Sequence, residues 1–230
     1  MARTQQQRRE ATVARLLQAS IDTILEVGYA RASAAVITKR AGMSVGALFR
    51  HFETMGDFMA ATASEVLRRQ LETFTKRVAE IPADRPALEA VLTIQRDITS
   101  SPTNAVLYEL MIAGRTDEKL NAHLQDVFGQ YTAKIHDTAR ALRGAEAFSE
   151  ETFPVLVALL TNVFDGAALV RGLLPDWDIE DRRIQLLAAL ITTAWAHLDG
   201  LSAQAAQSRP SPHARRESGS RQRKPPRGAS

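Results

Sequence analysis

One short stretch, centred on Gly42, constrains the fold of this chain more than any other. A helix-length apolar segment, residues 33–40, is followed by a brief break and then by a second segment, residues 45–52. Ser33 and Ser44 stand at the starts of these segments, where a hydroxyl oxygen can accept a hydrogen bond from a free backbone N–H. Gly42 can adopt the positive φ that a sharp turn requires. The stretch therefore predicts a helix-turn-helix.

The two predicted helices each have an inward face. Leu48 and Phe52 are four residues apart and so lie on the inward side of the second helix. The corresponding stripe of the first helix comprises Val36, Ile37, Arg40 and Ala41. A helix with small side chains near its N-terminus can approach base edges in a major groove. Aromatic and basic side chains further along can then contact the phosphates. Such an outward face is formed by Val45, Gly46, Ala47, Phe49, Arg50 and His51.

The same residues also match the G-x-S-x-G pattern of a hydrolase nucleophile elbow, with Ser44 as the nucleophile. That elbow places its serine between a strand and a helix. Here a helical segment precedes the serine, and no β-branched strand lies nearby. We therefore expect no catalytic residue and no enzyme activity.

Taken together, these motifs resemble the N-terminal DNA-binding domain of the TetR family of transcriptional regulators. The resemblance is carried by Gly28-Tyr29, Ala32-Ser33, Ala41-Gly42-Met43-Ser44 and Gly46-Ala47-Leu48-Phe49-Arg50-His51-Phe52. It implies that Ser33 contacts a phosphate and that residues 45–47 lie nearest the bases. Phe49 and His51 would then lie near the phosphate backbone. Motif and resemblance together predict a DNA-binding set of Ser33, Lys39, Ser44, Val45, Gly46, Ala47, Phe49, Arg50 and His51.

The chain departs from the family pattern at the start of its next helix. Family members usually have a lysine three residues after the His-Phe pair, where this chain has Met55 followed by Gly56. The basic residue common at the start of the first motif helix is absent as well. Arg31, Lys39 and Arg50 would have to supply the positive charge.

The whole chain reads as all-α, with roughly nine helices and three parts. Residues 1–56 form the DNA-binding domain with a flexible basic arm at residues 1–8, and residues 57–201 form an effector-binding and dimerisation domain. Residues 202–230, rich in Ser, Pro and Arg, are expected to be a disordered basic tail. The expected helices after the motif cover residues 57–80, 85–99, 103–113, 117–143, 152–170 and 179–201, and an amphipathic helix over residues 10–27 precedes it.

Composition excludes several classes of protein. The chain has no cysteine, and His123 and His136 lack a partner at metal-ligand spacing, so we expect neither a metal nor a cofactor. The longest apolar run, residues 153–174, contains Asn162, Asp165 and Arg171, which argues against a membrane span. The N-terminus lacks the apolar core of a signal peptide. A cytoplasmic protein is expected.

The last two predicted helices are apolar on two sides, and a helix of that kind must be covered on both. We expect them to form a shared four-helix interface between two chains; the alternative is a monomeric bundle in which both are central. A second stripe beside the first includes Val155, Leu159, Leu186 and Leu190. The stripe assigned to the interface consists of Phe153, Leu156, Leu160, Phe164, Ala167, Leu187, Ile191 and Trp195.

Aromatic and flexible apolar residues from different helices predict a ligand pocket in the body, although such residues also form ordinary cores. Tyr108, Asn162 and Arg96 could provide a polar contact. The predicted pocket residues are Phe74, Ile94, Arg96, Leu107, Tyr108, Met111, Phe128, Tyr131, Asn162 and Phe164.

The function that follows is a homodimeric repressor that binds a pseudo-palindromic double-stranded operator and is released by a small, largely apolar effector. The alternative is an architectural nucleic-acid binder that uses mainly the basic ends of the chain. A repressor should prefer one operator strongly over random DNA, whereas non-specific binding depends chiefly on salt.

Overall fold

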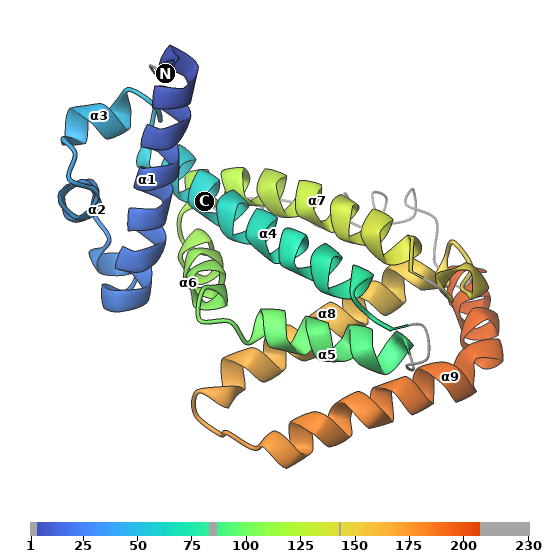
Figure 1. Cartoon of the computed structure of the whole chain (residues 1–230). Helices are drawn as coiled ribbons and strands as arrows, with labels where there is room; N and C mark the ends of the chain where they lie inside the picture. The colour runs from blue at the N-terminus through green and yellow to red at the C-terminus, as the bar shows by residue number, and fades with distance from the viewer. Residues whose placement is uncertain (1–3, 83–86, 143, 208–230) are drawn as a thin grey trace, which may run out of the picture.

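A computed structural model of the chain describes residues 4–82, 87–142 and 144–207, without the side chains of Trp177 and residues 194–207. Within these ranges all the regular secondary structure is helical, which confirms the all-α prediction (Figure 1). The elements are α1 (Gln5–Val27), η1 (Tyr29–Arg31), α2 (Ala34–Ala41), α3 (Val45–Phe49), α4 (Met55–Ala79), α5 (Ala87–Thr99), α6 (Asn104–Gly114), α7 (Glu118–Arg140), η2 (Ala145–Ala147), α8 (Thr152–Arg171) and α9 (Trp177–Gln207).

The first core joins four helices, α1, α2, α3 and the beginning of α4, and also includes residues of α6 and α7. Leu16, Ile37, Leu48 and Phe58 are fully buried there, one from each of the four helices. The Phe52 ring packs against Phe58, with centroids 4.9 Å apart. These contacts hold the two short motif helices, which are too brief to be stable alone.

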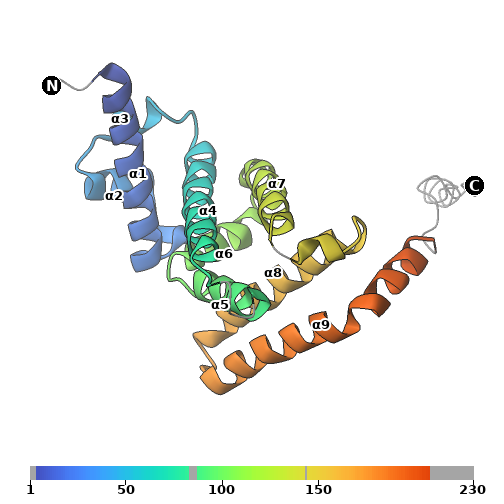
Figure 2. The same cartoon turned by 45° about the vertical axis from the view of Figure 1, so that its right-hand side comes forward.

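Helix α4 connects this core to the rest of the molecule. It packs along α7, and the two run side by side in both views (Figures 1 and 2). Its N-terminal half contributes Phe58 and Met59 to the first core, and its C-terminal half reaches α5. Helix α4 thus belongs both to the core that holds the helix-turn-helix and to the packing of the body.

A second, smaller core lies between α5, α8 and α9. It consists of Leu92, Phe164, Ile184 and Ala188, with Leu160 and Leu187 packed against it. Helices α8 and α9 lie on the side of the molecule away from α2 and α3, where α9 extends as a long arm (Figure 2).

Three predicted boundaries are wrong. Helix α1 begins at Gln5, so residues 4–8 are not a flexible arm, because Thr4 and Gln7 form a reciprocal capping box. Helix α3 ends at Phe49 rather than at residue 52. Helix α9 continues through Gln207 into the segment expected to be a tail. Residues 1–3 and the remaining tail, 208–230, lie outside the described residues.

Helix α8 is long and apolar enough to cross a membrane, judged by length and composition alone, so the sequence argument against a span does not hold for it. Core helices of globular proteins pass the same test. Here Phe153 and Phe164 are buried within the protein, while several outer residues of the helix are exposed. Contiguous exposed apolar patches are a common feature of interaction surfaces.

Candidate DNA-binding surface and effector cavity

The helix-turn-helix has the predicted caps. The Ser33 hydroxyl accepts a hydrogen bond from the Val36 N–H at 3.4 Å, and the Ser44 hydroxyl accepts one from the Ala47 N–H at 3.2 Å. Gly42 has φ 62° and ψ 41°, the left-handed conformation that glycine adopts without strain. The turn is therefore set by local signals in the sequence.

Arg15 of α1 braces this turn, a role that sequence reasoning missed. Its Nε donates to the Ala41 carbonyl at 3.0 Å, and its Nη2 donates to the same carbonyl at 2.5 Å. A longer bond of 3.4 Å reaches the Gly42 carbonyl. These carbonyls end α2 and lack intrahelical partners, so a cationic donor stabilises them. No local pattern could reveal this pair, because its members lie far apart in sequence.

The outward face of α3 is open to solvent. Val45 is 40% exposed and Phe49 44% exposed, and Gly46 and Arg50 are exposed beside them. Ala47 is half-buried, and Leu48 is fully buried as expected. The solvent-exposed face therefore has small side chains at the N-terminal end, followed by an aromatic and a cationic side chain.

The basic residues near α3 differ in their exposure to solvent and in whether they already have a partner. Lys39 is exposed, whereas Arg40 forms an ion pair with Glu26. His51 is half-buried, and its Nδ1 has no hydrogen-bond partner in the described part of the chain. The predicted inward stripe of α2 is partly wrong, because Val36 is 43% exposed and Arg40 is exposed. Thr38 is buried beside Ile37 and Ala41 instead, and its hydroxyl donates to the Ala34 carbonyl at 2.7 Å.

Helix α1 carries basic residues beyond the motif. Arg8 lies seven residues before Arg15, hence on the same face of the helix, about 10 Å further along the axis. Arg8 and Arg9 are exposed. The charge that was assigned to a flexible arm is therefore held on a helix beside the turn.

At the start of α4, where Met55 stands in place of the family lysine, the helix is capped by a carboxylate two residues further on. The Asp57 Oδ2 accepts from the Thr54 N–H at 2.9 Å, and the Asp57 N–H donates to the Thr54 hydroxyl oxygen at 3.1 Å, which closes a capping box. The Thr54 hydroxyl also donates to Asp57 Oδ2 at 2.8 Å. This hydroxyl bond lowers the pKa of Asp57. His123 of α7 approaches the other carboxylate oxygen with its Nε2, at 3.3 Å. Among the described residues no group of His, Asp or Glu could hold a metal ion.

A large cavity lies between the C-terminal half of α4 and helices α5, α7, α8 and α9. Its volume is about 660 Å³, within the range of sites for small molecules. Most of the wall is aliphatic or aromatic. The lining comprises Phe74, Val78, Ile81, Ala87, Leu88, Val91, Leu92, Gln95, Ile135, Ala139, Ala141, Leu142, Gly144, Ala145, Ala147, Phe148, Phe153, Leu156, Val157, Leu160, Thr161, Ile191 and Thr192.

Of the ten predicted pocket residues, only Phe74 lines this cavity. Leu107 is buried in the first core, Phe164 is buried in the second, and Ile94 is also buried away from the cavity, which corrects their assignment. Met111 and Asn162 are exposed. Phe128 and Tyr131 both pack against the first core, and Tyr131 also lines a small separate cavity beside Gln70.

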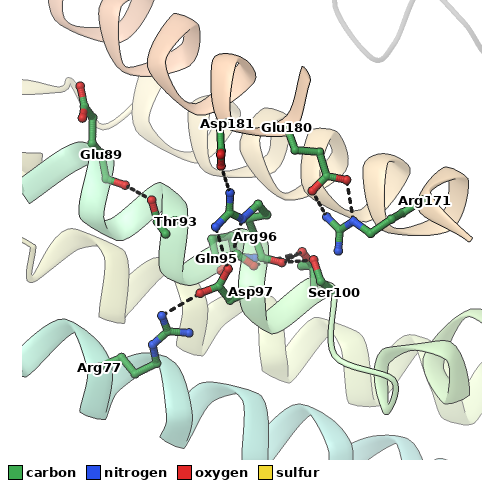
Figure 3. A network of polar contacts seen from close by, with 11 residues as sticks. Arg77, Glu89, Thr93, Gln95, Arg96, Asp97, Ser100, Arg171, Glu180 and Asp181 are labelled. Carbon is green, nitrogen blue, oxygen red and sulfur yellow. Dashed lines mark hydrogen bonds and ion pairs between the residues drawn. The ribbon is translucent and has the colours of Figure 1, made fainter. Parts of the chain in front are cut away.

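Arg96 belongs to a chain of ion pairs rather than to the pocket (Figure 3). Its Nη2 lies 3.1 Å from Asp97 Oδ1, and its Nη1 pairs with Asp181 of α9. Asp97 also accepts from Arg77 of α4 at 2.8 Å. The chain links α4 through α5 to α9. A buried pair between Arg171 and Glu180, at 2.5 Å, ties the end of α8 to α9.

Tyr108 is likewise engaged within the protein. Its hydroxyl donates to Asp165 Oδ1 of α8 at 3.1 Å and accepts from the Asn104 amide at 2.5 Å. Asn104 also accepts from Gln70 of α4 at 2.8 Å. Burial raises the pKa values of both Tyr108 and Asp165. This buried polar network joins α4, α6 and α8 away from the cavity.

The stripe predicted as a dimer interface faces inward in part. Phe153, Phe164 and Ile191 are buried within one chain, and Leu160 and Leu187 pack against the second core, so this assignment is wrong for these residues. Leu156 lines the cavity, Ala167 is half-buried, and the side chain of Trp195 lies outside the description. The exposed apolar residues of α8 and α9 and their connection are Val155, Leu159, Leu169, Val170, Leu173, Leu174, Ile179, Leu186 and Leu190.

Comparison with known proteins agrees with this architecture. The family model for bacterial regulatory proteins of the tetR family matches residues 16–62, from α1 into α4. An uncharacterized HTH-type transcriptional regulator of Mycobacterium tuberculosis is 81% identical over 192 residues, which cover 84% of this chain and 98% of the relative. The chain belongs to the TetR family of transcriptional regulators. It is therefore a DNA-binding regulator rather than an enzyme.

Solved structures share the fold at low sequence identity. A TetR-family regulator from Mesorhizobium loti has a TM-score of 0.63 at 12% identity, covering 80% of this chain and 97% of the other. A transcriptional regulator from Saccharomonospora viridis, solved in complex with choline, has a TM-score of 0.59 at 16% identity, with coverages of 80% and 97%. Both support the helical fold of this TetR regulator over most of its length.

Proposed function

We propose that this TetR-family regulator is a cytoplasmic, homodimeric repressor that binds a pseudo-palindromic operator and is released by a largely apolar effector. The observation that carries the proposal is the open face of α3, with Val45, Phe49 and Arg50 exposed around a fully buried Leu48. A short helix held rigidly and exposed on one side suits insertion into a major groove.

In this arrangement the N-terminal residues of α3, 45–47, approach the base edges because their side chains are small. Arg50 and Lys39 bind phosphates or guanine acceptors, and Ser33 contacts a phosphate at the start of α2. Arg8 and Arg9 add phosphate contacts from α1. This basic surface compensates for the missing lysine at Met55.

A second copy of the chain covers the exposed apolar face of α8 and α9. Leu186 is 60% exposed and Leu190 is 51% exposed, four residues apart on one side of α9. Val155 and Leu159 repeat that spacing on α8. A two-fold dimer would present two α3 helices to half-sites about one helical turn apart, or a multiple of that spacing.

The cavity supports the effector role because α4 reaches both functional regions. Phe58 of α4 lies in the first core, and Phe74 and Val78 of the same helix line the cavity. A ligand that fills the cavity can therefore shift α4 and change the spacing of the two α3 helices. The Saccharomonospora protein of the same fold was solved in complex with choline, which supports a small-molecule site in this fold. Coupling of about 1–3 kcal/mol between effector and DNA is expected.

The test is fluorescence anisotropy with labelled intergenic DNA from upstream of the gene. Arg50→Ala should weaken specific binding by about 1–3 kcal/mol if Arg50 contacts a base. The matched control is Arg115→Ala, an exposed arginine at the end of α6, which should bind like the parent. Equal binding by Arg50→Ala and the parent, with both proteins folded, would contradict the DNA-binding assignment. Equal affinity for random DNA would instead favour the architectural alternative.

A further inference from the structure

We propose that the cavity takes an uncharged ligand with an apolar body and a single hydrogen-bonding group, and that Gln95 of α5 binds this group. The inference rests on the proposed effector role and specifies the chemistry of that site. It depends on which polar groups line the cavity and which of them already have partners.

The described lining of the cavity contains no acidic, basic or histidine side chain. An ion transferred into such a site would lose its hydration without gaining a partner, which is far more costly than burying a neutral polar group. One cation, Arg140, lies behind the wall, with its guanidinium 3.9 Å from the centroid of the Phe153 ring. It already donates to the Phe148 carbonyl at 3.0 Å and pairs with Glu150 at 3.0 Å. Arg140 therefore disfavours a second cation at Phe153 and has little capacity for an anion.

Three polar side chains line the described wall, and two are already engaged. The Thr161 hydroxyl donates to the Val157 carbonyl at 2.9 Å, and the Thr192 hydroxyl donates to the Ala188 carbonyl at 2.7 Å. Each threonine retains only acceptor capacity. The Gln95 carboxamide makes no hydrogen bond to the part of the chain that the structure describes. It can both donate and accept, as recognition of a hydroxyl, carbonyl or amide group requires.

Gln95 also lies where a ligand can influence α4. It borders a second cavity of about 30 Å³ together with Phe74, Gln70 and Tyr131. That space is large enough for a water molecule. Gln70 is buried on α4 and donates to Asn104 in the polar network that reaches α8. A polar group bound at Gln95 therefore lies beside the helix that carries the helix-turn-helix.

The experiment uses three probes with the same ten-carbon chain: decan-1-ol, decanoate and decyltrimethylammonium. Their affinities for the full chain are measured at pH 7.5 by displacement of the neutral fluorophore N-phenyl-1-naphthylamine. Decan-1-ol should bind at least about ten-fold more tightly than either ion, because only the ions lose uncompensated hydration. Gln95→Leu should weaken decan-1-ol binding by about five-fold, the effect of one lost hydrogen bond. Gln130→Leu, the same substitution at an exposed position on α7, should leave all three affinities unchanged.

Leu156→Trp fills the cavity, so it tests whether the cavity is the effector site separately from the ligand chemistry proposed at Gln95. Circular dichroism checks that each variant is folded. If Leu156→Trp leaves decan-1-ol binding intact, the probe binds elsewhere, and both the cavity as effector site and this inference are overturned. Suppose instead that Leu156→Trp abolishes binding, but decanoate or decyltrimethylammonium binds the parent as tightly as decan-1-ol. In that case the inference alone is overturned, as it is if Gln95→Leu binds the alcohol like the parent.

Discussion

The helix-turn-helix domain and the α8–α9 pair are both helical and rich in apolar residues, but they bury those residues differently. In the first domain, one large apolar side chain from each of α1, α2, α3 and α4 is fully shielded from solvent. In α8, a helix of 20 residues, only Thr152, Phe153 and Phe164 are buried. One region is closed by its own chain, and the other leaves apolar surface on both its cavity side and its outer side.

This difference indicates where the functions lie. A recognition helix must hold its side chains rigidly, so the first domain is built from capped helices around a filled core. A sensing region must exchange partners, and an open cavity with an uncovered outer face allows this. Helix α4 takes part in both regions. Its buried residues end at Gln70, and beyond that point Phe74 and Val78 line the cavity.

The largest expected effect tests how much the tightly packed first core contributes to stability, compared with the exposed apolar residues near α8. Phe58→Ala should lower the free energy of unfolding by about 3–5 kcal/mol, because the surroundings cannot refill the space of the ring. Leu173→Ala, at a position that is 83% exposed, should change it by less than about 0.5 kcal/mol. Urea denaturation at one fixed protein concentration measures both. Similar losses in the two variants would remove the contrast between the regions.

The second expected effect tests the outer face of α9. Leu186→Glu combined with Leu190→Glu places two charges in the proposed interface and should raise the dimer dissociation constant at least about 100-fold, or roughly 3 kcal/mol. Light scattering after size-exclusion chromatography should then report a folded monomer. Leu187→Glu is the comparison, since Leu187 packs on the inner core and its substitution should lower the unfolding temperature instead. A parent protein that is monomeric at micromolar concentration would refute the dimer.

The sequence predicted a feature well when the contacts that form it join residues close together in the chain, and poorly when they join distant ones. Ser33, Gly42 and Ser44 act on backbone groups within a few residues, and so the turn and its caps were predicted correctly. The start of α1 was missed although Thr4 and Gln7 carry the spacing of a capping box. Attention to that spacing would have replaced the flexible arm with a helix.

The cavity could not be derived in the same way. Aromatic and aliphatic residues at helical spacing line a void or fill a core according to how far apart the helices cross, which is a long-range property. Leu107 and Leu156 are of the same type, yet one is buried in the first core and the other lines the cavity. Likewise, periodicity showed two apolar stripes on α8 but not which of them faces outward, since that depends on the position of α5.

The smallest expected effect concerns Asp165, a half-buried acid of α8 that hydrogen-bonds to Tyr108 of α6. Burial raises the pKa of Asp165 above its usual value near 3.8, more than the Tyr108 hydroxyl bond lowers it. The folded chain therefore holds this proton more tightly than the unfolded chain, and the contribution of Asp165 to stability falls as pH rises through that window. Asparagine removes the buried charge and keeps an oxygen for the Tyr108 hydroxyl.

Asp165→Asn should therefore leave the melting temperature unchanged or raise it by about 1–3 °C at pH 7, on the scale expected for a chain of this size. The advantage over the parent should shrink as the pH falls, because the parent's carboxyl group then becomes protonated. Melting curves between pH 4 and pH 8 measure this, with Asp126→Asn on the exposed face of α7 as the control. If Asp165→Asn is less stable at pH 7 than at pH 4, relative to the parent, the ionised carboxylate stabilises the contact between α6 and α8. The network would then depend on its charge in the same way as the chain of ion pairs around Arg96.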